Sequence, residues 1–170
     1  MMKKYISLMM MALICSFGFT GCDPETDEEP GGTSVEKMAG LWDVTVDAYD
    51  DAGNLLYEDP YGMGVFQVTT FNTAANVPTE MWVSDDNNFW AFQMKVDVNY
   101  EARTFSCAEK DYDADGTGTG IITNGKVLEG AARNLHGMPN DSIVFDIKFS
   151  DDDYGFVYRI SGQRYTGFYE

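Results

Sequence analysis

The chain has 170 residues, and its 28 Asp and Glu against 11 Lys and Arg give a net charge of −17 at pH 7. This length indicates a single domain. A chain this acidic lacks the basic face that nucleic acids and anionic lipid surfaces require, so we expect no nucleic-acid partner. A hydrophobic fraction of 44% excludes a disordered acidic chain, and one His with three Cys leaves little material for metal or cofactor chemistry.

The first residues have the layout of an exported leader. Lys3 and Lys4 form a basic head, and the apolar stretch 5–19 that follows, about fifteen residues, is shorter than the roughly twenty of a membrane-spanning helix. Phe19-Thr20-Gly21-Cys22 then resembles a bacterial lipobox, the motif at which a leader is cut just before a lipidated Cys. We therefore expect residues 1–21 to be a lipoprotein signal peptide and Cys22 to carry a membrane anchor.

Residues 22–33 follow as an expected tether. After Cys22 they are acidic, punctuated by Pro and Gly and free of apolar side chains, which predicts an extended, self-repelling segment. Acidic residues directly after the lipidated Cys resemble the surface-export signal of Bacteroidales lipoproteins, although a plain solvated spacer has the same composition. We expect a bacterial outer-membrane protein, held by its lipid anchor and exposed at the cell surface rather than on the periplasmic side.

The remaining residues, 34–170, have the pattern of a single all-β domain. Apolar and polar side chains alternate, which predicts strands with one dry face. The clearest strands are expected at 42–49, 92–99, 143–150 and 156–161, and weaker ones at 64–71, 79–84, 103–108, 116–123 and 126–133. Turn residues separate them, including Asn124-Gly125, and only 34–39 suits a helical turn. About nine short antiparallel strands indicate a barrel or a sandwich.

The sequence Gly40-Leu41-Trp42 is similar to the opening motif of lipocalin-like barrels, in which the Trp fills the closed end. With the lipobox and the segments 71–76, 80–83, 89–98 and 104–105, the chain resembles the Bacteroidales lipoprotein family labelled lipid-binding putative hydrolase, over 34–170. The resemblance implies an antiparallel, lipocalin-like (calycin-type) β-barrel of about 8–10 strands. It also implies that a basic side chain of the last strand, Arg159 or Arg164, lies against Trp42.

A barrel of this size holds either its own side chains or one small ligand. An aromatic- and Met-rich interior suits an acyl chain such as palmitate or another lipid-like molecule, so we expect a hydrophobic small ligand; a packed core has the same composition. Met81 is an alternative to Trp82 for the inward position. The expected ligand-lining residues are Trp82, Trp90, Phe92, Met94, Phe105, Phe145 and Tyr158.

Catalysis has little support in the residues. His136 is the one His, in a loop with Gly and Pro, and the chain has no Gly-x-Ser-x-Gly nucleophile motif. We therefore expect no catalytic residues, and a hydrolase remains the third alternative, suggested by the family label.

A calcium loop is only half present. Asp111, Asp113 and Asp115 precede Gly116 with the alternation of such a loop, but Ile122 stands where its closing Glu belongs. This pattern favours an acidic hairpin turn over a calcium site.

The main alternative function is a surface module that binds glycans or proteins. Tyr is common at recognition surfaces, and the chain carries several Tyr that we expect to be exposed. They are Tyr57, Tyr61, Tyr112, Tyr165 and Tyr169.

Overall fold

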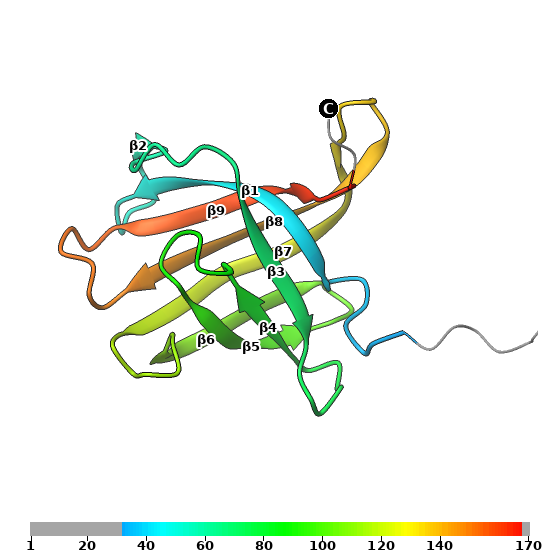
Figure 1. Ribbon diagram of the computed structural model, residues 1–170, viewed down its shortest axis with the longest axis horizontal. Coiled ribbons are helices and arrows are strands. Elements are labelled where there is room, and N and C mark those ends of the chain that lie inside the picture. The colour runs from blue at the N-terminus through cyan, green and yellow to red at the C-terminus, as the bar shows by residue number, and fades with distance from the viewer. Residues whose placement is uncertain (1–31, 168–170) are drawn as a thin grey trace, which may run out of the picture. The chain divides into compact units, whose positions relative to one another are not determined.

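Nine antiparallel strands form the described part of the computed structural model, residues 32–167 (Figure 1). They are β1 (Gly40–Tyr49), β2 (Leu55–Glu58), β3 (Phe66–Asn72), β4 (Glu80–Ser84), β5 (Gln93–Asn99), β6 (Thr104–Asp111), β7 (Thr119–Arg133), β8 (Pro139–Phe149) and β9 (Val157–Arg164). Each strand from β3 to β8 pairs with the next, and β1 pairs with both β3 and β9. The ring is therefore closed, which confirms the predicted antiparallel barrel.

Two parts of the expected organisation lie outside the described residues: the signal peptide with Cys22 and most of the tether, and Tyr169 near the other terminus. Between residues 32 and 167, no helix is long and apolar enough to cross a membrane.

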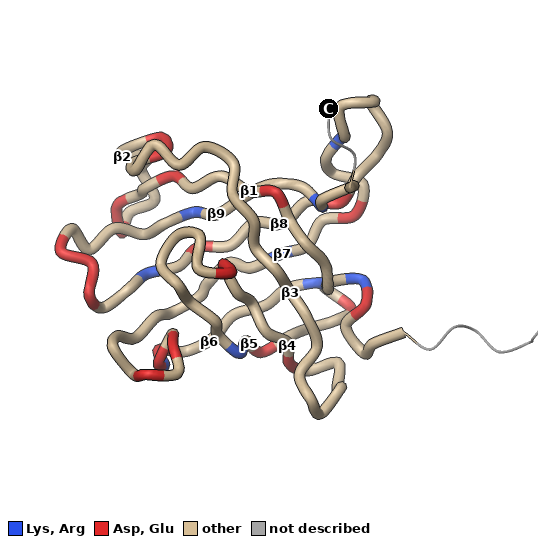
Figure 2. The backbone as a smooth tube through the Cα atoms, viewed as in Figure 1, with Lys and Arg blue, Asp and Glu red and all other residues tan. Residues whose placement is uncertain are grey.

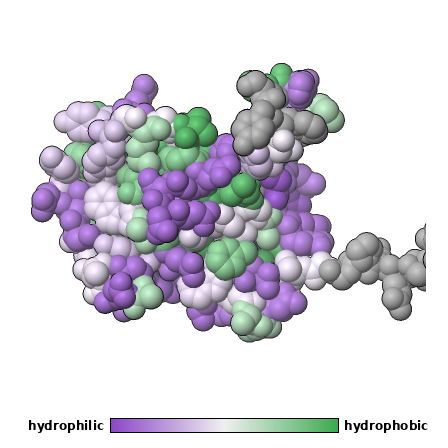
Figure 3. All heavy atoms as spheres, in the orientation of Figure 1, coloured by the Kyte–Doolittle hydropathy of each residue, from purple (hydrophilic) through white to green (hydrophobic). Residues whose placement is uncertain are grey.

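Every second side chain of a strand points into the barrel and fills it, because successive residues of a strand point to opposite faces of the sheet. Trp42, Val44, Val46 and Ala48 of β1 are all buried, as are alternate residues of β5, β8 and β9. These dry faces are the ones that the sequence predicts. On the face that Figure 3 shows, apolar side chains form small areas broken up by hydrophilic ones.

The longest strand, β7, corrects the sequence prediction of two strands joined by an Asn124-Gly125 hairpin turn. Asn124 does adopt a left-handed backbone, with φ of 56°, but the result is a bulge between Thr123 and Lys126 in the pairing with β8. A bulge bends a strand without ending it. Gly125 leaves room for the ring of Phe105, because an added Cβ would lie 2.5 Å from that ring. Beyond the bend, β7 continues to Arg133.

One end of the barrel is closed around Trp42. The indole Nε1 donates a hydrogen bond to Oγ1 of Thr70 (2.8 Å), and this hydroxyl donates to the carbonyl of Met38 (2.6 Å). Met38 belongs to the turn of residues 34–38, which covers this end and buries Val35 beside it. We call Trp42, Thr70, Arg164 and this turn the closed end.

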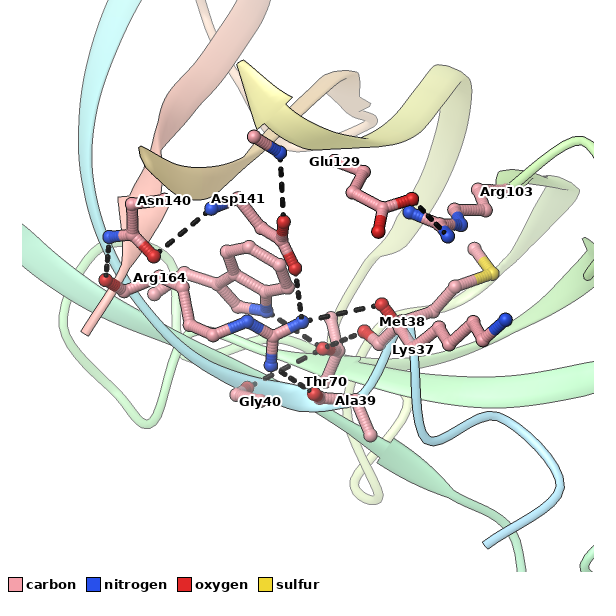
Figure 4. A network of polar contacts seen from close by, with 12 residues as sticks. Lys37, Met38, Ala39, Gly40, Thr70, Arg103, Glu129, Asn140, Asp141 and Arg164 are labelled. Atoms are coloured by element: carbon pink, nitrogen blue, oxygen red, sulfur yellow. Dashed lines mark hydrogen bonds and ion pairs between the residues drawn. The ribbon is translucent and has the colours of Figure 1, made fainter. Parts of the chain in front are cut away.

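Arg164 completes the closed end (Figure 4). Its guanidinium lies 4.4 Å from the centre of the Trp42 ring, and Nη1 donates to the carbonyl of Ala39 (2.6 Å). Nη2 contacts Asp141 at 3.3 Å. An added Cβ on Gly40 would lie 2.3 Å from Nη1, so a larger residue there would displace the guanidinium. A cation over a desolvated indole contributes about 1–2 kcal/mol of stability.

The other candidate, Arg159, lies elsewhere. It pairs with the buried Asp146 through Nε and Oδ1 (2.7 Å) and covers the ring of Tyr49 at 4.3 Å. Burial opposes ionisation of Asp146, but hydrogen bonds from Arg159 and Asn124 outweigh it, so the pKa of Asp146 lies below its ordinary value. Of the two arginines, Arg164 is therefore the one against Trp42.

Candidate functional site

The end opposite the closed end gathers most of the aromatic side chains. The strand order brings the loops 50–54, 59–65, 85–92, 112–118 and 150–156 to this end, and the last two lie at the left of Figure 1. We call the following ring cluster the aromatic mouth. Its members are Tyr57, Tyr61, Phe66, Phe89, Trp90, Tyr112, Phe149, Tyr154, Phe156 and Tyr158.

The loop between β4 and β5, residues 85–92, is folded by the buried carboxylate of Asp85. Its Oδ2 accepts hydrogen bonds from the backbone N–H of Phe89 (3.0 Å), Trp90 (2.7 Å) and Ala91 (2.9 Å), and its Oδ1 from that of Asn87 (3.1 Å). Asn87 and Ala91 have left-handed φ angles of 64° and 58°, uncommon for residues other than Gly. The carboxylate therefore holds a chain path that the backbone does not prefer.

This loop places two rings over the barrel interior. Trp90 stacks on Phe149 with 4.7 Å between ring centres and 6° between planes, and Phe89 meets Tyr158 edge-on at 5.2 Å. The indole Nε1 of Trp90 donates to Asp151 (3.2 Å) at the start of the β8–β9 loop. Phe89 and Trp90 thus form a plug between the core and solvent.

A chain of hydrogen bonds beside this plug joins Tyr61, Tyr158 and Asp152. The hydroxyl of Tyr158 donates to Oδ2 of Asp152 (3.1 Å), so the contact of 2.7 Å between the Tyr61 and Tyr158 hydroxyls has Tyr61 as donor. Burial, together with Tyr61 and the negative charge of Asp152, raises the pKa of Tyr158 far above its ordinary value. Tyr158 therefore stays protonated and fixes Tyr61 at the rim.

Outside the plug lies an open groove of about 410 Å³, which we call the mouth groove. Three of its residues are largely exposed, namely Tyr154 (71%), Tyr57 (57%) and Tyr61 (46%). Tyr154 and Phe156 stack with 5.2 Å between ring centres and 12° between planes, and Tyr57 packs against Phe156 at 5.8 Å. Its lining is Tyr57, Pro60, Tyr61, Tyr154 and Phe156.

The interior residues expected to line a ligand are packed against one another. Phe145 contacts the rings of Phe92 and Phe105, with centres 6.4 Å and 5.7 Å apart, and Met94 is fully buried. Tyr158 is buried below the mouth, and Trp90 belongs to the plug. The expected lining set is thus divided between a packed core and the aromatic mouth.

Trp82 points the other way. Met81 and Val83 are its fully buried neighbours on β4, so the alternation of the strand places Trp82 on the outer face and Met81 in the interior. Trp82 lines an outer groove of about 580 Å³ that also contains charged residues such as Lys95, Lys110 and Asp111. The expectation that Trp82 faces the interior is therefore wrong.

The Tyr residues expected at the surface also divide. Tyr57 and Tyr61 line the mouth groove, whereas Tyr112 is buried, because its ring packs edge-on against Phe149 and its hydroxyl donates to Asp151 (2.8 Å). Tyr165 follows β9 and is half-buried. The expectation that Tyr112 is exposed is wrong.

The remaining candidates lie apart from the groove. His136 is in the β7–β8 loop, at the same end of the strands as the closed end. Asp113 accepts hydrogen bonds from the backbone and hydroxyl of Thr117, which lower its pKa and fold the β6–β7 loop. Among residues 32–167, no three His, Cys, Asp or Glu side chains gather into a group that could hold a metal ion, the set of Asp111, Asp113 and Asp115 included.

Comparison with known proteins gives one positive result. The family described as lipid-binding putative hydrolase matches residues 27–169, which is most of the chain. A search of the curated proteins finds no match.

The bonding of Asp85 predicts a local effect of its removal. Asp85→Ala leaves the N–H groups of Phe89, Trp90 and Ala91 without their carboxylate acceptor, and we expect the free energy of unfolding to fall by about 3 kcal/mol. Urea unfolding followed by Trp fluorescence measures it. Asp115→Ala, on the exposed β6–β7 loop, is the control and changes stability by less than about 0.5 kcal/mol. Equal effects of the two substitutions would contradict the role given to Asp85.

Proposed function

The chain belongs to the lipid-binding putative hydrolase family, and on that premise we propose that its barrel binds a hydrophobic small molecule at the aromatic mouth. The observation that carries the proposal is the mouth groove, whose lining is formed by four aromatic residues and one Pro. Its volume of about 410 Å³ lies within the range of small-molecule sites, which are mostly apolar with a few polar anchors. The hydroxyl groups of Tyr57, Tyr61 and Tyr154 provide such anchors.

The mouth suits a ligand better than the other grooves and the interior do. The outer grooves near Trp82 and near Lys126 are larger, but charged and amide side chains line much of them. Inside the barrel, Phe92, Met94 and Phe145 are each at most 1% exposed to solvent, and such close packing is typical of a protein core. A ligand therefore lies in the mouth groove, where the ring of Tyr61 stands between it and the rings of Phe89 and Trp90.

The arrangement of the two ends supports a lipocalin-like barrel as the finer fold assignment. Trp42 lies two residues after a Gly at the start of the first strand, and Arg164 of the last strand covers it. Such a closed end leaves the opposite end as the natural access for a ligand.

We also propose that the protein is a lipoprotein of the bacterial outer membrane, anchored through Cys22 and displayed at the cell surface. The leader-like residues before Cys22, the lipobox and the acidic residues after it support this location. The lipid anchor then attaches the protein to the membrane, and the barrel remains free to bind a separate ligand.

Ligand binding is tested with the neutral, apolar fluorescent dye N-phenyl-1-naphthylamine. We expect the full chain to bind it, and Phe156→Ala to weaken binding about tenfold, because this ring contacts both Tyr57 and Tyr154 in the groove. Leu135→Ala is the matched control, since Leu135 is 80% exposed in the β7–β8 loop at the other end. Failure of the dye to bind, or equal loss in both variants, would refute a ligand site at the mouth.

Anchoring is tested separately. Cys22→Ala removes the residue that would carry the acyl chains, and stable attachment needs more than one such chain. We expect the variant to stay unprocessed or to leave the membrane fraction, as measured by fractionation and by the mass of the chain. Normal maturation and membrane attachment of the variant would exclude Cys22 as the anchor.

A glycan-binding module is the second candidate, and one observation favours it. Tyr154 is 71% exposed and stacks on Phe156 through one face, so its other face is a surface on which a sugar ring can stack. The two functions differ in what displaces the dye, because an acyl chain competes in the first case and a soluble polysaccharide in the second.

A further inference from the structure

The loops around the mouth groove carry one sign of charge. Within the described loops 50–54, 59–65, 85–92, 112–118 and 150–156, and within β2, there is no Lys or Arg. Figure 2 shows the acidic residues along these loops, with the basic ones on the strands and the opposite side. The acidic residues are Asp50, Asp51, Glu58, Asp59, Asp85, Asp86, Asp113, Asp115, Asp151, Asp152 and Asp153.

Several of these charges are chain neighbours of groove-lining residues. Glu58 follows Tyr57, Asp59 precedes Pro60, and Asp153 precedes Tyr154 in the chain. Asp59 and Asp152 are held in place, Asp59 by the N–H groups of Met63 (2.8 Å) and Gly64, and Asp152 by that of Phe156 (2.8 Å). Lys148 of β8 forms an ion pair with Asp51 of this rim (2.8 Å). The groove is thus apolar in its lining and negative in its surroundings.

From this combination we propose that the mouth groove selects an amphiphile whose polar end is cationic, such as an apolar chain or ring system bearing a quaternary ammonium group. The inference rests on the proposed function, because it concerns the same groove and adds the charge of its ligand. The exposed faces of Tyr57, Tyr61 and Tyr154 attract a cation through their ring electrons. The surrounding carboxylates add a field that concentrates cations and repels anions.

The proposal disfavours the free carboxylate of a fatty acid as the preferred polar end. Such a group would approach Glu58, Asp59 and Asp153 with no Lys or Arg among the groove residues to pair with it. An anionic polar end is therefore placed outward into solvent or rejected, whereas a cationic one is drawn to the rim.

Three probes with one fluorophore test the proposal on the full chain: diphenylhexatriene, its trimethylammonium derivative and its propionic acid derivative. At low salt we expect the cationic probe to bind about tenfold more tightly than the neutral one, and the anionic probe most weakly. High salt reduces the preference, because it screens exposed charges.

Matched variants assign the preference to residues. The double variant Glu58→Gln, Asp153→Asn should lower the affinity for the cationic probe about threefold and leave the neutral probe unchanged. Glu36→Gln with Glu101→Gln, two exposed acids near the closed end, makes the same change in net charge and should change neither. Tyr154→Leu keeps an apolar side chain but removes the ring, so it should reduce the difference between the cationic and the neutral probe.

The outcomes separate the two proposals. Equal affinity for the three probes, or tightest binding of the anionic one, overturns the cation selectivity while hydrophobic binding at the mouth stands. Binding of none of the three overturns the proposed function itself, and the selectivity with it. If the Glu36 and Glu101 variant reduces the cation preference as much as the Glu58 and Asp153 variant does, the preference reflects net charge. That result overturns its assignment to the groove.

Discussion

The pairing of β1 with β9 is the contact on which the rest of the structure depends. It runs in unbroken register from Trp42 opposite Arg164 to Tyr49 opposite Val157. The backbones approach closely at Gly162, where an added Cβ would lie 2.0 Å from the carbonyl oxygen of Asp43, so only Gly fits. Closure removes the free edges that an open sheet would expose, and it makes an inside that the alternating apolar side chains can fill.

The same register makes the two ends different. It sets Arg164 beside Trp42, so that the first and last strands of the ring lock one end with a cation over an indole and a hydrogen-bonded turn. At the opposite end β1 leaves β3 and pairs with the short β2, whose residues are all exposed. The loops there are longer, and they carry the rings and the negative charges. One end is thus closed by Trp42 and Arg164, and the other carries the exposed rings and the acidic loops.

Much of the barrel follows from the period of two in the sequence. Trp42, Met94, Phe145 and Ile160 occupy buried positions because their strands alternate cleanly, and alternation is a property of neighbouring residues that a sequence displays. Asn124-Gly125 shows the limit of local reasoning. A left-handed Asn suits a hairpin turn and a bulge equally well, and only the partner strand β8, which continues past it, decides between them.

The site was harder to predict, because it depends on contacts between distant loops. The large aromatic side chain of Trp82 suggests an interior position, yet its buried neighbours Met81 and Val83 place it on the outer face. Asp85 belongs to a run of polar turn residues in the sequence, and its burial under four backbone N–H groups has no local signal. The contact of Tyr61, in the loop 59–65, with Tyr158 of β9 likewise requires β9 to pair with β1.

Ligand binding at the mouth, above a packed core, is tested most directly by contact quenching of tryptophan fluorescence. Trp42 lies at the closed end and Trp90 in the plug, so a Trp82→Phe chain reports both and a Trp82→Phe, Trp90→Phe chain reports Trp42 alone. Trp90 packs against the groove residue Tyr61, so with an amphiphile brominated on its apolar chain the account predicts measurable quenching in the first chain and almost none in the second. Strong quenching of Trp42 would place the ligand deep in the barrel and contradict the account.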